Sequence, residues 1–477
     1  MSQINPESPK TEDKSSRRNF IKGGTVAAAG AAAASTLPIE SFAQVAGSDE
    51  IKVGIVGVGG RGSGAVAQTL NVDGCRLVAA GDVFESRLQG TMKQRASGGL
   101  NRIRAALEKS GKSDRYDVPS QNEFVGFDCF EKVIDKCDMV ILTTPPGFRP
   151  EMFEAAIQAG KHVFMEKPVC TDAKGYNRTI EAAKLADEKG LKVVVGLQRH
   201  YHDSYLEAFK KVHEDGIIGN IVSAQCYWNG GRPWTVQRDP NWSELEFQMY
   251  NWYHFAWVCG DHIAEQHVHN IDIVNWFVSG DSVMGGNPIN AQGMGSRSGW
   301  ESPKSGEIFD HHYVEFRYDN GVIMNSQCRQ IKGTFRRVEE EISGSEGILT
   351  MSQGKAVAKD YKGNEIWKWG ASEGGDRRRD APKAANPYQV EHDRLHAAIR
   401  ENKPLNNAYY GAKSSFTATL GRLATYTGQV VKWDEAVGSN FELVPDKMTW
   451  DHEPPVKPND DLSYNPAIPG QTKLPWA

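Results

Sequence analysis

The chain has 477 residues, which is enough for two or more domains with cores of their own. Its formal net charge is −5, from 55 basic and 60 acidic residues, which argues against a large basic face for nucleic acid. No run of about 18 strongly apolar residues occurs, so the sequence predicts no membrane span.

The first 43 residues differ in character from the rest of the chain. A polar segment contains the arginine pair Arg17-Arg18. It is followed by a run rich in alanine and glycine, and then by small residues around Ala43. This order is typical of a twin-arginine export signal. We therefore predict that residues 1–43 are such a signal, cleaved after Ala43, and that the mature protein is periplasmic. The alternative is a disordered tail in which the arginine pair occurs by chance.

A glycine-rich loop follows the first predicted strand, residues 51–57. In the sequence GVGGRG, Gly57, Gly59 and Gly62 have the G-x-G-x-x-G spacing of a dinucleotide-binding loop. The first glycine permits a tight turn, the second lets the backbone approach a pyrophosphate, and the third lets helix and strand pack closely. The free N–H groups of the helix that follows can bind phosphate.

A second predicted strand, CRLVAAGD, ends at Asp82, about 20 residues after the loop. An acidic residue at this position can accept hydrogen bonds from both ribose hydroxyls of the cofactor, which favours NAD over NADP. Arg61 in the glycine-rich loop could hold a phosphate, so NADP stays an alternative.

Strands and helices continue to alternate up to residue 200. The predicted strands are 138–146, 161–168 and 191–200, and the predicted helices are 149–160 and 171–190. Such alternation predicts a doubly wound parallel sheet, a Rossmann domain over residues 50–200. Ligands bind beyond the carboxyl ends of the strands in this fold. The predicted cofactor-binding residues are Gly57, Gly59, Gly60, Arg61, Gly62, Asp82, Thr144, Pro145, Glu166, Lys167 and Gln198.

Lys167 lies in the sequence KHVFMEKP, where a buried strand runs into Glu166, Lys167 and Pro168. A lysine at the carboxyl end of a strand, beside a nicotinamide, can bind a substrate oxygen and favour its alkoxide. Taken alone, this lysine would more often be an exposed loop residue.

The second half of the chain predicts an α+β domain over residues 201–450. Residues 311–330 form two alternating strands around a DNG turn, and 339–351 and 356–369 suggest further strands. Helices are predicted at 386–402 and 411–429. We expect a large, mostly antiparallel open sheet, followed by a proline-rich strap at 451–477.

The segment CGDHIAEQHVHNIDIVNWF, residues 259–277, carries the second set of candidate catalytic residues. We predict one helix capped by Asp261, on which Glu265, His269 and Asp272 share a face. A carboxylate beside an imidazole raises its basicity and fixes its orientation. Glu265 and His269 would then remove a hydroxyl proton. The alternative is a core histidine satisfied by a carboxylate.

A metal site is a further alternative, because this part of the chain contains many residues of types that bind metals. They are Glu265, His262, His267, His269 and the pair His311-His312. His267 and His269 are two residues apart, on different faces of a helix, which does not fit the spacing of a helical zinc pair. We therefore predict no metal site.

Aromatic residues cluster before this segment, and they include Trp228, Trp234, Trp252 and Tyr253. Such rings can pack on the apolar faces of sugars, although they more often belong to a core or an interface.

Together, GVGGRG, Asp82, the TTPP turn at 143–146 and AGKHVFMEKPV resemble the glucose-fructose oxidoreductase / inositol dehydrogenase / MocA family over nearly all of the chain after residue 43. The resemblance implies that Lys167 is a catalytic or substrate-binding group. It also implies that the outer face of the second sheet makes oligomer contacts, in a homodimer or homotetramer.

The family motif D-x-G-x-H-x-x-D matches residues 265–272, so His269 corresponds to the catalytic histidine and Asp272 to the later aspartate. Asp272 would orient substrate hydroxyls or support the histidine. The chain departs from the motif at Glu265 and His267. Arg149 stands where many members have a histidine.

The resulting prediction is an NAD(P)-dependent oxidoreductase that transfers hydride between a tightly bound nicotinamide and a secondary alcohol of a sugar, polyol or glycoside. Lys167, His269, Glu265 and Asp272 are its predicted catalytic residues. One alternative is an enzyme that keeps its NAD and uses transient oxidation with no net redox change, as a glycosidase or a sugar-sugar oxidoreductase. The other is a nucleotide-binding protein without activity.

Overall fold

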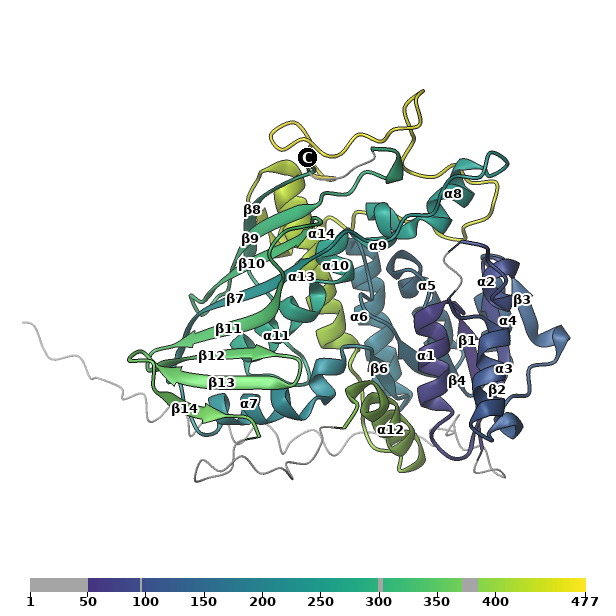
Figure 1. The fold of residues 1–477 in the computed structure, drawn as a ribbon, viewed down its shortest axis with the longest axis horizontal. Helices are drawn as coiled ribbons and strands as arrows, with labels where there is room; N and C mark the ends of the chain where they lie inside the picture. Colours follow the sequence, from purple (N-terminus) through teal and green to yellow (C-terminus); the bar gives the residue numbers. More distant parts are fainter. Residues whose placement is uncertain (1–49, 95–96, 299–302, 371–384) are drawn as a thin grey trace, which may run out of the picture. The chain divides into compact units, whose positions relative to one another are not determined.

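The first part of the chain builds a parallel sheet of six strands, as the alternation of strands and helices predicts. The computed structural model describes residues 50–94, 97–298, 303–370 and 385–477. The strand order is β3-β2-β1-β4-β5-β6, and every neighbouring pair is parallel (Figure 1). The strands are β1 (Ile51–Val56), β2 (Cys75–Asp82), β3 (Glu123–Val125), β4 (Met139–Leu142), β5 (His162–Met165) and β6 (Val193–Val195).

Helices connect these strands. They are α1 (Gly60–Thr69), α2 (Glu85–Gln89), α3 (Leu100–Lys109), α4 (Cys129–Ile134), α5 (Arg149–Gln158) and α6 (Ala173–Glu188). All four side chains of β4 are buried, because a parallel sheet of this type is covered on both faces. Three strands end earlier than the sequence predicts. The freed residues lie at the carboxyl edge of the sheet, with Thr144 and Lys167 in loops and Gln198 at the start of a short 3-10 helix, Gln198–Tyr201.

The second sheet has nine strands in the order β14-β13-β12-β11-β7-β10-β9-β8-β15. β7 and β10 run parallel and the other neighbouring pairs run antiparallel, which confirms the predicted mostly antiparallel sheet. The strands are β7 (Ile221–Gly230), β8 (Asn290–Ser296), β9 (His311–Arg317), β10 (Ile323–Gln330), β11 (Arg337–Gly344), β12 (Gly347–Ser352), β13 (Lys355–Asp360), β14 (Glu365–Lys368) and β15 (Val431–Lys432).

The remaining helices lie largely between and around the two sheets (Figure 1). They are α7 (Asp203–His213), α8 (Glu244–Tyr250), α9 (Ala256–Cys259), α10 (His262–Glu265), α11 (Val268–Ser279), α12 (Pro387–Arg400), α13 (Ala408–Thr427) and α14 (Trp433–Gly438). Helix α13 packs on β8 and β9 and also on α6. One continuous apolar core therefore includes residues of both sheets.

The predicted helix at 259–277 is divided in the structure. Helix α10 ends at Glu265, and α11 begins at Val268, so Gln266 and His267 lie in a turn. Asp261 caps α10 as expected, because its side chain accepts a hydrogen bond from the His262 N–H. The division changes which side chains share a face.

Residues 451–477 contain no helix or strand. This segment is nevertheless fixed by Tyr464, which is buried and packs edge-on against Phe255. The Tyr464 hydroxyl donates to Glu244 and accepts a hydrogen bond from Arg238. Among the helices of the described residues, none has both the length and the apolar character needed to cross a membrane.

Candidate active site

A cavity of about 400 Å³ lies at the carboxyl edge of the parallel sheet. It is lined by residues at or after the carboxyl ends of all six strands, together with residues of the second half of the chain. The parallel strand ends bring the predicted cofactor-binding residues together, as the fold requires. All of them line the cavity: Gly57, Gly59, Gly60, Arg61, Gly62, Asp82, Thr144, Pro145, Glu166, Lys167 and Gln198.

The glycine-rich loop has the geometry that its spacing predicts. Gly57 has φ +89°, a conformation that side chains disfavour. A Cβ atom on Gly62 would lie 2.1 Å from the Gly57 carbonyl oxygen. A Cβ atom on Gly59 would meet only Arg87, at 4.0 Å. Helix α1 begins at Gly60 without a side-chain cap, so its first N–H groups remain available to an anion.

Asp82, at the end of β2, faces the cavity and also holds the loop. Its carboxylate accepts hydrogen bonds from the backbone N–H of Val58 at 2.8 Å and of Phe84 at 3.2 Å. Burial raises the pKa of Asp82 to about 6, and the two N–H groups oppose this shift. The carboxylate is therefore positioned by the backbone before a ribose reaches it.

Arg61 contacts protein carboxylates in this structure. Its guanidinium pairs with Glu166 and, at 3.4 Å, with Glu391 of α12, and it lies over the ring of Tyr388. Burial acts to lower the pKa of Arg61, but the charges of Glu166 and Glu391 outweigh it, so the pKa is raised. The expected phosphate-binding role of Arg61 would require it to leave these partners.

Lys167 and Glu265 both line the cavity and contact each other. The Lys167 ammonium donates to the backbone carbonyl of Glu265 and lies 3.4 Å from its carboxylate Oε1. Burial raises the pKa of Glu265, while Lys167 and Arg149 oppose the shift. This contact joins the first half of the chain to the second.

His269 lines the same cavity, but Glu265 does not orient it. The carboxylate of Glu265 is directed to Lys167, and the Nδ1 atom of His269 is enclosed without a hydrogen-bond partner among the described residues. Burial, followed by the charges of Lys167 and Arg199, holds the pKa of His269 well below its usual range. The prediction that a carboxylate raises its basicity is therefore wrong, because the helix is divided between the two residues.

Asp272 lies outside the cavity, contrary to its predicted role. Its carboxylate accepts hydrogen bonds from Ser414 and His200, both at 2.8 Å, and it is buried. His267 also points away from the cavity, toward Ser326 of β10 at 2.8 Å. Both side chains belong to the core between α11 and its neighbours.

Arg149, to which the sequence motifs assign no site role, lines the cavity and is buried. Its guanidinium donates to the backbone carbonyls of Thr144 and Pro168 and so connects the TTPP turn with the turn after Lys167. Burial lowers the pKa of Arg149 to about 10, against the charges of Glu265 and Glu166. In the sequence, only the departure from the family pattern at this position indicated that Arg149 lies at the site.

Several other cavity residues could not be recognised from sequence motifs. Phe84, Arg87 and Phe127 lie near Asp82, and Gln266 and Tyr388 come from the second half of the chain. Of the predicted aromatic cluster, Trp234, Trp252 and Tyr253 line the cavity. Trp228 stacks on His269, with ring centroids 5.9 Å apart.

The fold and the loop geometry define a dinucleotide-binding class of protein, and comparison with known proteins agrees. Residues 51–197 match the oxidoreductase family with an NAD-binding Rossmann fold, and residues 206–350 match the GFO/IDH/MocA C-terminal domain. The two matches together cover more than half of the sequence. The chain belongs to the GFO/IDH/MocA oxidoreductase family.

Among curated relatives, the chain is 29% identical over 223 residues to the scyllo-inositol 2-dehydrogenase (NADP(+)) IolW of Bacillus subtilis, covering 46% of this chain and 52% of that protein. It is 25% identical to inositol 2-dehydrogenase 2 of Saccharopolyspora erythraea, covering 66% of this chain and 77% of that protein. The first of these alignments, like others to inositol 2-dehydrogenases, spans about half the length of the relative.

Solved structures share the fold. The aldose-aldose oxidoreductase of Caulobacter crescentus, complexed with glycerol, has a TM-score of 0.58 at 18% identity, with 80% of this chain and 100% of that chain covered. The myo-inositol 2-dehydrogenase of Lactobacillus plantarum has a TM-score of 0.53 at 20% identity, with 80% and 98% covered.

Proposed function

We propose that this protein is an NAD(P)-dependent oxidoreductase that acts on a secondary alcohol of a sugar, polyol or glycoside. One observation carries the proposal: Lys167, Glu265 and His269 line the same cavity as the glycine-rich loop and Asp82. Inositol dehydrogenases among the relatives support the substrate class. Trp234, Trp252 and Tyr253 supply flat apolar surface in that cavity, which suits a carbohydrate ring.

The residues present fit a dinucleotide. The uncapped start of α1 would hold the pyrophosphate, and Asp82 would hold the ribose hydroxyls. When bound, the nicotinamide would accept or return the hydride. Because Asp82 carries a negative charge when ionised, it favours NAD over a cofactor with a 2′-phosphate.

Lys167 binds the reacting oxygen in this proposal. Its ammonium stabilises an alkoxide at that oxygen, and the contact with Glu265 holds the ammonium at the cavity wall. His269 is neutral because of its lowered pKa, and it can accept the hydroxyl proton. Arg149 fixes the turns on either side of the reacting position.

The proposal is tested by identifying the nucleotide released from the heated protein by mass spectrometry. A panel of sugars and polyols is then screened at the absorbance of the reduced nicotinamide. We expect NAD or NADP and reduction by at least one carbohydrate. Absence of any nucleotide, together with no binding of added NAD or NADP, contradicts the proposal.

A redox-neutral reaction is the second candidate. Tyr388 and Glu391 of α12 contact the side chain of Arg61 in the glycine-rich loop. Contacts of this kind, kept while the cofactor is bound, would slow its exchange. Product formation without added NAD, with no net change in nicotinamide absorbance, would favour this candidate over a dehydrogenase with free cofactor.

We further propose export by the twin-arginine route and a periplasmic location, on the strength of the Arg17-Arg18 segment, which lies outside the described residues. Cell fractionation tests this proposal, with a double variant that carries Arg17→Lys and Arg18→Lys. We expect the wild-type protein in the periplasmic fraction and the double variant in the cytoplasm. The same location for both proteins contradicts the proposed route.

We also propose a homodimer or homotetramer formed through the outer face of the second sheet. On that face Met294 and Tyr313 are register partners on β8 and β9 and are 72% and 37% exposed. Light scattering of the purified protein gives the number of chains in the assembly, and a monomer contradicts this proposal.

A further inference from the structure

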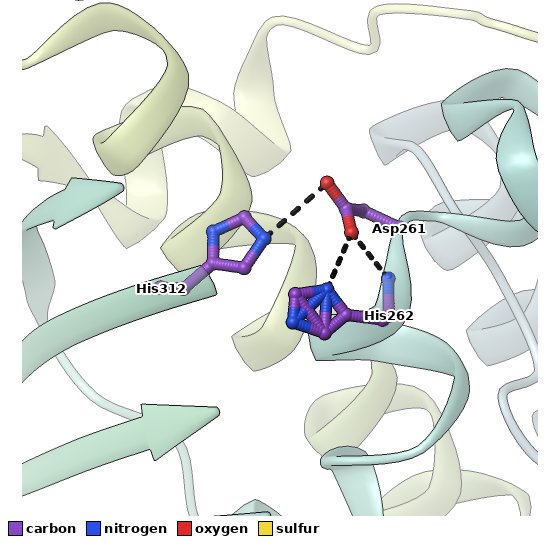
Figure 2. Close-up of side chains that lie close together, drawn as sticks. All are labelled: Asp261, His262 and His312. Carbon is purple, nitrogen blue, oxygen red and sulfur yellow. Dashed lines mark hydrogen bonds and ion pairs between the residues drawn. The ribbon is translucent and has the colours of Figure 1, made fainter. Parts of the chain in front are cut away.

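The side chains of Asp261, His262 and His312, all of types that bind metals, lie close together (Figure 2). All three are buried, and none of them lines the cavity. Asp261 and His262 stand at the start of α10, and His312 comes from β9. One potential ligand atom from each residue lies within 4.8 Å of the other two. The tertiary structure therefore brings together residues that are distant in the chain.

The spacing suits a small divalent cation. Asp261 Oδ1 lies 2.9 Å from His262 Nδ1, and Asp261 Oδ2 lies 3.3 Å from His312 Nε2. Ligand atoms about 2.0–2.1 Å from a tetrahedral zinc ion are ~3.3 Å from each other. The two distances start from different oxygens of the carboxylate, and the shorter one is a hydrogen bond with His262 Nδ1. A bound ion would replace this hydrogen bond and draw the three side chains together.

One unpaired nitrogen atom provides a second, independent observation. His312 Nε2, the proposed ligand atom of that residue, is enclosed and has no hydrogen-bond partner among the described residues. His312 Nε2 is within ion-pair distance of Asp261 but is not placed to donate a hydrogen bond to it. A buried nitrogen atom without a hydrogen bond destabilises the folded chain, and coordination of a cation by His312 Nε2 would remove this penalty.

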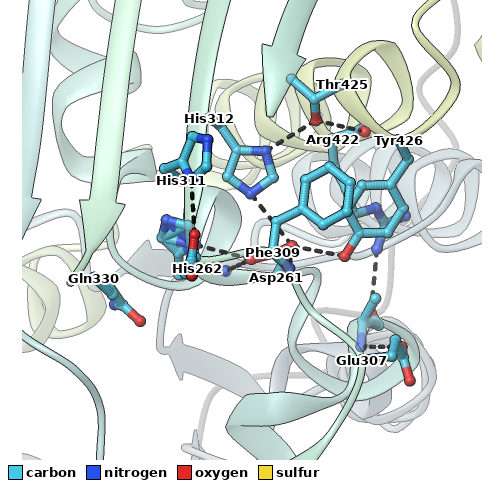
Figure 3. Close-up of polar contacts among 12 residues, drawn as sticks. Asp261, His262, Glu307, Phe309, His311, His312, Gln330, Arg422, Thr425 and Tyr426 are labelled. Atoms are coloured by element: carbon cyan, nitrogen blue, oxygen red, sulfur yellow. Dashed lines mark hydrogen bonds and ion pairs between the residues drawn. The ribbon is translucent and has the colours of Figure 1, made fainter. Parts of the chain in front are cut away.

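Neighbouring residues form hydrogen bonds to His312 and Asp261 that fix their orientation, as the residues behind the ligands of a metal site do (Figure 3). The hydroxyl of Thr425 donates to the Arg422 carbonyl at 3.0 Å, so at 2.9 Å it accepts a hydrogen bond from His312 Nδ1. This leaves an electron pair on His312 Nε2, facing Asp261. The Asp261 carboxylate in turn accepts hydrogen bonds from the Tyr426 hydroxyl and the Phe309 N–H.

We propose that Asp261, His262 and His312 bind one divalent transition-metal ion, with zinc as the cation that the ligand set suits best. Its role is structural, because the three side chains are enclosed and outside the cavity wall. Asp261 has φ +72°, a strained conformation for a residue other than glycine, and metal bonds would help to hold it. The ion would fix the chain at the start of α10, which ends at Glu265. The proposal does not depend on the proposed oxidoreductase activity.

The test is metal analysis of the full chain by inductively coupled plasma mass spectrometry, as purified and after incubation with zinc and removal of free metal. We expect about one equivalent per chain in the wild type and in H311Q, and an at least fivefold lower content in H312Q. His311 is a matched control, because it is the neighbouring histidine on β9 and its side chain is 39% exposed.

A second measurement does not depend on any variant. Removing the metal from the wild-type protein with a chelator should lower its thermal midpoint, and zinc should restore it. A wild-type protein that holds less than about one tenth of an equivalent after zinc incubation overturns the proposal. Equal metal content in wild type and H312Q overturns it as well. If H312Q does not fold, the content and the thermal shift of the wild type decide.

Discussion

The ammonium of Lys167 donates a hydrogen bond to the backbone carbonyl of Glu265. In a continuous helix this carbonyl would accept the hydrogen bond of the His269 N–H. The His269 N–H instead donates to the Gln266 carbonyl at 3.3 Å. Helix α10 therefore ends at Glu265, and α11 restarts at Val268. The contact between Lys167 and the Glu265 carbonyl therefore holds the lysine at the point where the predicted helix divides into α10 and α11.

Replacing Lys167 by methionine or His269 by alanine should each lower turnover by at least about a hundredfold, because each removes a group that handles the charge or proton of the reacting oxygen. The released nucleotide, measured by mass spectrometry, should remain at the wild-type amount. Lys136→Met is a matched control, since Lys136 is exposed. Near-normal turnover in either active-site variant contradicts the assigned roles.

Two glycine variants should separate folding from cofactor binding. A methyl group at Gly62 would collide with the Gly57 carbonyl, so Gly62→Ala should lower the thermal midpoint of the cofactor-free protein. A methyl group at Gly59 meets only Arg87 at 4.0 Å, so Gly59→Ala should keep the fold. Because Gly59 lines the cavity, that variant should still weaken NAD binding, measured by titration calorimetry. Unchanged affinity in Gly59→Ala would place the pyrophosphate elsewhere.

The affinity of the cofactor-free protein for NAD should depend on pH through Asp82. Its pKa is raised to about 6, so the folded chain holds a proton there between about pH 4 and 6 that the unfolded chain has lost. The contribution of Asp82 to stability therefore falls as pH rises through this window. The ionised form is the one that accepts both ribose hydroxyls.

We therefore expect NAD affinity to rise about tenfold from about pH 5 to about pH 7, measured by titration calorimetry. Asp82→Asn should bind NAD more weakly and lose this pH dependence. A wild-type affinity that stays constant over the same range would show that the protonation of Asp82 does not control binding.

Arg199 and Glu340 form an enclosed ion pair that connects the short 3-10 helix after β6 with β11. Arg199 also donates to the backbone carbonyl of His269 at 3.2 Å. Arg199→Met leaves Glu340 without its charge partner and should lower the free energy of unfolding by about 3–5 kcal/mol in urea denaturation. The double variant with Glu340→Met should recover most of this loss. No recovery would mean that hydrogen bonds other than the ion pair dominate.

Arg149→Met should destabilise the protein by about 2 kcal/mol, because the carbonyls of Thr144 and Pro168 lose their donor. Arg178→Met removes a partly exposed arginine that pairs with Glu154 and Asp446, and should cost less than about 1 kcal/mol. Urea denaturation measures both values. Equal stability of Arg149→Met and wild type would show that the two turns do not need this arginine.

Sequence patterns alone predict the parallel sheet, the glycine-rich loop and the positions of Asp82 and Lys167 at strand ends. These features depend on local spacing and on the rule that the carboxyl ends of parallel strands share one edge, and the structure has them in that arrangement. The DNG hairpin between β9 and β10 likewise follows from local turn chemistry.

The partners of the residues at 259–277 could not be predicted from the sequence, because they depend on contacts with distant segments. Helical periodicity predicts that Glu265, His269 and Asp272 share a face only if the helix is continuous. The contact from Lys167 directs Glu265 to the lysine, and Asp272 binds His200 and Ser414. The charge and burial of groups from distant segments set the protonation of His269 and Glu265, and no local pattern encodes those distances.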